Sequence, residues 1–86
     1  MKVEETYLKG CYVITPKVFK DERGYFLETF NEKMFLKETG IKTDFVQDNL
    51  SKSSKGVLRG LHFQKPPFNQ AKLVRCVEGS VIDVAV

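Results

Sequence analysis

The sequence predicts a small, mainly β domain with one short helix. Short segments rich in β-branched and aromatic residues alternate with turn residues along the chain of 86 residues. Segments of this length and spacing are typical of β-sandwiches and β-barrels. One segment, near residues 31–39, has helix signals instead. No repeat or linker interrupts this pattern, so we expect a single domain over residues 1–86.

The first strands and their turn come early in the chain. Residues 12–19 mix β-branched and aromatic side chains and predict a strand, in which Pro16 places a bend or a strand edge. Residues 20–24 predict a turn, because Gly24 is free to take a positive φ. Residues 25–30 predict the next strand.

The helix near residues 31–39 has both a start signal and a stop signal. Asn31 is a good N-cap and Gly40 supplies the stop. Phe30 and Phe35 occupy the two positions of a hydrophobic staple. A helix this short is unstable alone in water, so we expect it to lie on a sheet.

The second half of the chain predicts further strands, separated by polar turns or by turns containing Gly and Pro. Their ranges are 43–50, 57–64, 71–77 and 80–86, the last two forming a hairpin around Glu78-Gly79. The apolar run at the end of the chain would present a free strand edge if nothing covered it. We therefore expect either another subunit or, preferably, a continuing domain to cover it.

Composition and charge narrow the classes of function. No apolar run exceeds four residues, so no segment can span a membrane, and the acidic residues near the start exclude a secretory signal. These features predict a cytoplasmic protein. The net charge is +3, but residues 49–77 contain six basic side chains and no acidic one. That stretch is a candidate surface for an anionic partner, or a solvated face with a chance bias.

The cysteines do not indicate a metal site or a disulfide scaffold. Cys11 and Cys76 lie far apart and match no metal-binding spacing. We expect both to be small, buried hydrophobic side chains in a reducing compartment.

The candidate reactive residue is His62, the only histidine. A lone histidine on a strand is more often structural than catalytic, but its surroundings here favour chemistry. Arg59 and Lys72 supply positive charge, and Gln47 and Asn49 share one face of the preceding predicted strand. A base beside cations and amides is suited to hold an anionic, oxygen-rich ligand near a proton acceptor.

Strand alternation raises a difficulty for this grouping. In a regular strand, Arg59 and His62 point to opposite faces. For both to reach one cavity the strand must bulge or twist, and Gly60 is the position where we expect that.

Four sequence runs resemble the dTDP-4-dehydrorhamnose 3,5-epimerase family. In chain order they are residues 19–26 (FKDERGYF), 45–49 (FVQDN), 56–64 (GVLRGLHFQ) and 70–75 (QAKLVR). Four blocks in the right order make a specific match. The resemblance covers nearly the whole chain, but only about the N-terminal half of the family's domain.

The resemblance implies a cupin-type jelly-roll barrel, of which this chain is the N-terminal half, and a homodimer in which strands exchange between subunits. It implies inversion of C3 and C5 of a dTDP-linked 4-keto-6-deoxy sugar, dTDP-4-dehydro-6-deoxy-D-glucose, by deprotonation next to the ketone. This reaction leads to dTDP-L-rhamnose, a precursor of bacterial surface polysaccharide. The resemblance also implies that no metal or other cofactor is needed. It implies no nucleic-acid partner and no membrane partner.

The resemblance also implies roles for individual residues. His62 matches the base that takes the proton, and Lys72 matches the residue that stabilises the enolate. The positions that bind the nucleotide sugar correspond to Arg23, Glu28, Gln47, Asn49 and Arg59. Having a single histidine, the chain lacks the His-x-His pattern usual in cupin metal sites, so we expect no metal.

Two elements of the family site have no match in the chain. The family's acid is a tyrosine and its base is oriented by a carboxylate, and both positions lie beyond Val86. Tyr7, Tyr12 and Tyr25 do not match the tyrosine's motif. We therefore expect an incomplete barrel. The alternatives are a related 4-keto-sugar ketoisomerase, a non-catalytic remnant that binds thymidine nucleotide sugars and, least favoured, a small nucleic-acid-binding β-domain.

Overall fold

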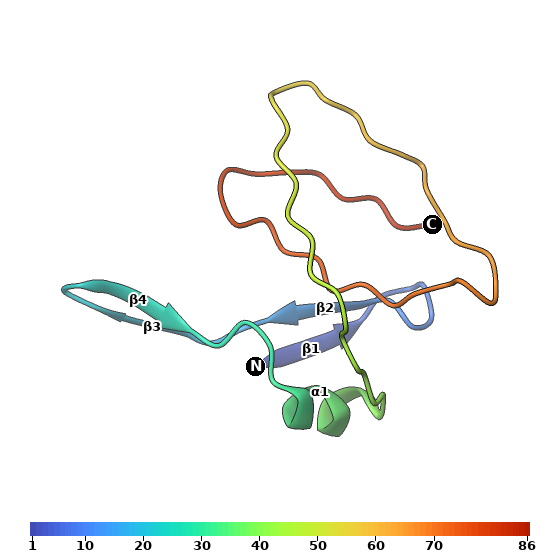
Figure 1. Cartoon of the computed structure of the whole chain (residues 1–86). Helices are drawn as coiled ribbons and strands as arrows, with labels where there is room; N and C mark the ends of the chain where they lie inside the picture. Colours follow the sequence, from blue (N-terminus) through green and yellow to red (C-terminus); the bar gives the residue numbers. More distant parts are fainter. The chain divides into compact units, whose positions relative to one another are not determined.

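The structure is a computed structural model that describes residues 1–86. Its elements are strands β1 (Lys2–Glu5), β2 (Tyr12–Thr15), β3 (Val18–Asp21) and β4 (Gly24–Leu27), followed by helix α1 (Glu32–Thr39). All of them lie in the blue-to-green half of the chain, and the yellow-to-red half contains no strand or helix (Figure 1). The chain divides into two compact units: unit 1 (Met1–Asp48 with Ala85–Val86) and unit 2 (Asn49–Val84).

The first sheet of unit 1 pairs β1 with β2. The strands are antiparallel, with Val3 opposite Ile14. Thr6 closes their connection by donating its backbone N–H to the carbonyl oxygen of Cys11 at 2.8 Å. The sequence did not predict β1, since lysine and glutamate have low strand propensity. The pairing with the β-branched residues of β2 decides its conformation.

The second sheet of unit 1 pairs β3 with β4. Pro16 lies between β2 and β3, so the predicted bend is confirmed and residues 12–19 form two strands instead of one. The turn between β3 and β4 is tighter than predicted, because Asp21 lies directly opposite Gly24 and only two residues connect them. Gly24 has a φ of 136°, in agreement with the predicted need for a positive φ.

Helix α1 begins and ends as its sequence predicts. The side-chain oxygen of Asn31 accepts a hydrogen bond from the backbone N–H of Met34 at 3.1 Å. Gly40 is left-handed, with a φ of 73°, and its N–H donates to the carbonyl oxygen of Leu36 at 2.7 Å. These two contacts satisfy backbone groups that would otherwise lack partners at the helix ends.

The core of unit 1 forms around Phe35, which is 8% exposed and is the one buried hydrophobic side chain. The ring of Phe30 lies 6.0 Å from that of Phe35, which confirms the predicted staple contact. Tyr12 approaches Phe35 at 6.4 Å, and Phe45 packs against Phe30 at 5.2 Å. Helix α1 lies next to β1, so the prediction that it needs a sheet is confirmed.

Unit 2 has turns at the predicted places but no strands. Backbone hydrogen bonds close turns from Ser54 to Val57 and from Lys65 to Phe68, and the chain bends at Glu78–Gly79. The predicted strands 57–64, 71–77 and 80–86 are absent, as is the predicted strand 43–50. A strand requires hydrogen bonds to a neighbouring strand, and these segments have none. The last two segments therefore do not form the predicted hairpin.

The chain is mainly β, but its sheets close no barrel. They are two separate pairs of strands. Most large apolar side chains are exposed, including Leu58, Ile82 and Val86. Helix α1 is too short to cross a lipid bilayer, and no other helix is present.

Candidate functional site

The residues predicted to form the site are divided between the two units. Unit 1 contains Arg23, Glu28 and Gln47, and unit 2 contains Asn49, Arg59, His62 and Lys72. All seven side chains belong to exposed residues. Each unit therefore has its own part of the predicted set.

Arg23 lies in the two-residue turn between β3 and β4, where a carboxylate holds it. Its Nε and Nη2 atoms donate to Oδ2 of Asp21 at 3.2 and 2.5 Å. Its backbone N–H donates to Oδ1 of the same residue at 2.8 Å. The side-chain hydrogen bond from Arg23, followed by the backbone one, lowers the pKa of the Asp21 carboxyl. The hydrogen bond to Asp21 in turn raises the pKa of Arg23.

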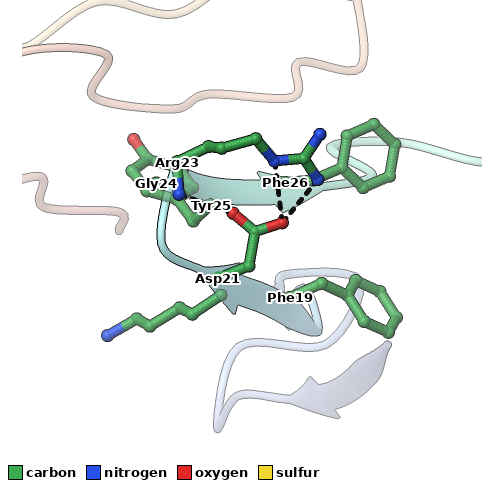
Figure 2. A pocket seen from close by; sticks show the side chains of 7 residues that line it. Phe19, Asp21, Arg23, Gly24, Tyr25 and Phe26 are labelled. Carbon is green, nitrogen blue, oxygen red and sulfur yellow. Dashed lines mark hydrogen bonds and ion pairs between the residues drawn. The ribbon is translucent and has the colours of Figure 1, made fainter.

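The turn borders an open hollow of about 450 Å³ on the β3–β4 hairpin. Its lining residues come from both strands and the turn: Phe19, Lys20, Asp21, Arg23, Gly24, Tyr25 and Phe26. Figure 2 shows the guanidinium of Arg23 joined to Asp21, with the Phe26 ring to one side of it. The hollow combines the cations of Lys20 and Arg23 and the carboxylate of Asp21 with three aromatic rings, so its polar groups carry charges of both signs.

Glu28 and Gln47 occupy segments without regular structure in unit 1. Glu28 immediately follows β4, which ends at Leu27. Gln47 lies in the segment after α1, where the sequence predicted a strand. Both are exposed, so their polar groups are accessible from solvent.

Arg59 is held by the turn that precedes it in unit 2. Its Nε donates to Oγ of Ser53 at 2.9 Å, and its Nη2 donates to the carbonyl oxygen of Lys52 at 3.1 Å. Both partners are neutral, so the positive charge of Arg59 is not compensated by a carboxylate through these contacts. The arrangement leaves Arg59 suited to attract an anion.

His62 lies close to Gly60, where the backbone is unusual. Gly60 has a φ of 118°, and a Cβ atom placed on it would lie 3.8 Å from Nδ1 of His62. The predicted β-bulge is absent because residues 57–64 have no partner strand. Gly60 does adopt a positive φ, but without a strand the expected meeting of Arg59 and His62 in one cavity stays a prediction.

The side chains that could bind a metal ion do not form a metal centre. The structure contains no group of three or more His, Cys, Asp or Glu side chains that could hold a metal ion. Cys11 is half-buried, and Cys76 is exposed with its Sγ 3.3 Å from the carbonyl oxygen of Glu78. The prediction of two buried cysteines is therefore wrong for Cys76, and Cys11 is buried only in part.

One residue of the site escaped the sequence analysis. Asp21 accepts both side-chain hydrogen bonds of Arg23, whereas the sequence indicated for it only a place in a turn. The pattern that could have found it is local, since an aspartate often accepts a hydrogen bond from the backbone N–H two residues later. An arginine at that second position can then reach the same carboxylate.

Comparison with known proteins shows which family the chain resembles. A family model described as dTDP-4-dehydrorhamnose 3,5-epimerase matches residues 5–86. An epimerase of that name from Shigella flexneri is 58% identical over 86 residues, which cover 100% of this chain and 48% of the relative. Another from Methanothermobacter thermautotrophicus is 56% identical over 82 residues, covering 95% of this chain and 43% of the relative.

A solved structure agrees with these matches. The crystal structure of dTDP-4-dehydrorhamnose 3,5-epimerase from Elizabethkingia anophelis has a TM-score of 0.73 and 61% identity to this chain. The match covers 80% of this chain and 38% of that one. The proteins that the chain resembles are thus sugar-nucleotide epimerases. The chain belongs to the dTDP-4-dehydrorhamnose 3,5-epimerase family, and it spans about half the length of the curated relatives it matches.

Proposed function

We propose that the chain carries the proton-abstracting half of a dTDP-4-dehydrorhamnose 3,5-epimerase. The observation that supports this is the extent of the family match, because residues 5–86 include His62, Lys72 and the five proposed substrate-binding residues of this chain. In the proposal the substrate is dTDP-4-dehydro-6-deoxy-D-glucose, which is inverted at C3 and C5. The chain forms the N-terminal part of a cupin-type jelly-roll barrel that works as a homodimer with exchanged strands.

His62 is the proposed base. A C–H bond beside a ketone is a very weak acid, so its proton can be removed only if the enolate oxygen meets a preplaced positive charge. His62 takes the proton from C3 or C5, the electron pair moves to the oxygen on C4, and Lys72 stabilises that oxygen. A proton from solvent water then adds to the carbon from the opposite face, since the family's acid tyrosine has no match in this chain, and His62 releases its own proton to solvent; this inverts the centre. A neutral imidazole is a suitable base for this step near neutral pH.

The nucleotide part of the substrate is anionic, and the proposed binding residues suit it. Arg23 and Arg59 bind the diphosphate through charge-assisted hydrogen bonds, because both guanidinium groups are exposed. Glu28, Gln47 and Asn49 accept or donate hydrogen bonds to the sugar and base. The absence of acidic residues from 49 to 77 keeps repulsive charge away from the phosphates in this stretch.

The test is proton exchange on the substrate in heavy water, followed by NMR. We expect the chain to introduce deuterium at C3 or C5, and His62→Ala to slow this by at least about 100-fold. Binding of dTDP should stay within about twofold, because His62 is exposed and acts on the sugar rather than the nucleotide. Lys65→Ala, an exposed cation in the same unit, is the matched control and should change neither quantity.

Three other outcomes are informative. If His62→Ala exchanges as fast as the wild type, the role of His62 is wrong. If deuterium enters at one centre only, a related single-centre epimerase or ketoisomerase is favoured. If the chain binds dTDP without any exchange, the alternative of a non-catalytic module that binds thymidine nucleotides is favoured.

A further inference from the structure

The turn between β3 and β4 contains a compact set of contacts that the proposed reaction does not use directly. One carboxylate, that of Asp21, accepts the backbone N–H of Arg23 through Oδ1 and two side-chain N–H groups of Arg23 through Oδ2. The strand register fixes Asp21 opposite Gly24. Both the backbone and the side chain of Arg23 are therefore fixed relative to the hairpin by a single neighbouring residue.

This contact leaves part of the guanidinium open. A guanidinium has five N–H groups in a planar fork. Asp21 takes the one on Nε and one on Nη2, so the two on Nη1 and the second on Nη2 remain without a partner in the chain. Nη1 and Nη2 form the edge that binds two oxygens of a phosphate at once. The side chain of Arg23 is 91% exposed, so this edge is accessible.

We propose that Asp21 is a positioning residue that holds the guanidinium of Arg23 with its Nη1–Nη2 edge ready to bind a phosphoryl group. The inference rests on the proposed function, in which Arg23 binds the diphosphate of the substrate. Asp21 itself touches no substrate. It acts through Arg23, and the ligand it serves is the diphosphate of a nucleotide.

Preorganisation is the physical reason for the effect. A long arginine side chain loses rotamer freedom when it binds an anion, and this loss weakens binding. Asp21 restricts that freedom in advance, because its carboxylate is itself fixed by the backbone of the turn. The pair is exposed to solvent, so it adds little to the stability of the fold. Its effect should be seen in affinity rather than in folding.

A second effect of Asp21 acts in the opposite direction. Its negative charge repels a phosphate, so removing the charge would strengthen binding if positioning were unimportant. Salt separates the two effects, because at about 1 M salt the Debye length falls to about 3 Å and repulsion between exposed charges is screened. Glu22 is the matched control, since it is an exposed acidic residue of the same turn with no hydrogen bond to Arg23.

The experiment is a titration of the 86-residue chain with dTDP at low salt and at high salt. We expect Asp21→Asn to weaken dTDP binding about threefold to fivefold, and to do so at both salt concentrations. Glu22→Gln should leave binding unchanged or slightly strengthen it at low salt. In an Arg23→Ala background, Asp21→Asn should cause no further loss, because the group that it positions is gone. The NMR signal of the Arg23 Nε–H should shift in Asp21→Asn and stay in place in Glu22→Gln.

The outcomes separate this inference from the function on which it rests. If the wild type does not bind dTDP, the proposed function of Arg23 fails and the positioning role fails with it. If the wild type binds dTDP but Asp21→Asn binds equally well or more tightly at high salt, Asp21 does not position Arg23 and the proposed function stands. An equal loss with and without Arg23 would also overturn the positioning role.

Discussion

Residues Met1–Asp48 contain both hairpins, the helix and the buried Phe35, whereas residues Asn49–Val84 contain no strand, no helix and no buried side chain. In the first region each turn and helix cap is closed by residues a few positions apart. In the second, the turns form in the same way, but the segments between them have no paired strand. Local signals are thus sufficient for turns, caps and short hairpins, while longer strands require partners from elsewhere.

The difference matters because the proposed chemistry lies in the second region. Asn49, Arg59, His62 and Lys72 all belong to unit 2, where they are exposed. Excluding water from an active site strengthens the electrostatic stabilisation of a developing charge. An exposed site of this kind does not exclude water. The part of the family's domain that this chain does not match is the natural candidate to cover these residues.

The largest expected effect is on the core of unit 1. Phe35→Ala should lower the free energy of unfolding of this unit by about 3 kcal/mol, because it removes the one buried ring and leaves a cavity. Circular dichroism during urea unfolding would measure the loss of helix signal. Leu36→Ala is the matched control, since Leu36 is exposed on the same helix, and it should have a much smaller effect. Similar losses for both variants would show that unit 1 has no specific core.

A smaller effect is expected at the start of helix α1. Asn31→Ala removes the acceptor for the Met34 N–H and should cost about 1 kcal/mol of helix stability. Asn31→Asp keeps an acceptor at the same place and should retain most of the stability. Amide exchange at Met34 and Phe35 would measure both. Equal protection in Asn31→Ala and the wild type would show that packing, not capping, fixes where the helix begins.

The smallest expected effect is the pH dependence of the β3–β4 hairpin. The pKa of Asp21 is lowered in the folded chain by its hydrogen bonds to Arg23. The carboxylate therefore stabilises the hairpin above its unfolded pKa, and this contribution is lost as the pH falls through the lowered folded value. NMR shifts of Arg23 and Gly24 should follow that titration, and those within residues 49–77, which contain no acidic side chain, should not. The transition should be absent in Asp21→Asn.

The sequence predicted the turns, the bend and the helix caps, which depend on residues only a few positions apart in the chain. Asn31, Gly40, Pro16 and Gly24 act through backbone geometry within a few residues, and the structure confirms each of them. The strands expected after residue 42 are absent because pairing depends on distant residues, which β-propensity does not encode. Strand β1 was missed for the converse reason, since its pairing with β2 outweighs its poor propensity.

Charge and strand position indicated part of the candidate site, and family resemblance supplied Arg23, Glu28 and the individual roles. Position along a strand suggested that Gln47 and Asn49 share a face, but no strand forms there. The roles of His62 as base and Lys72 as enolate stabiliser came from the motif match. The alternation of side chains along a strand does not reveal roles of this kind. Asp21 could have been found from its spacing to Arg23, since their contact is local.

The most direct test of the contrast between the two units is amide hydrogen exchange measured residue by residue on the 86-residue chain. We expect protection at the paired residues of β1–β4 and in α1, and exchange close to that of an unfolded peptide from residue 49 to residue 84. Alternating protection along residues 57–64 or 71–77 would contradict it, because that pattern would show paired strands in unit 2.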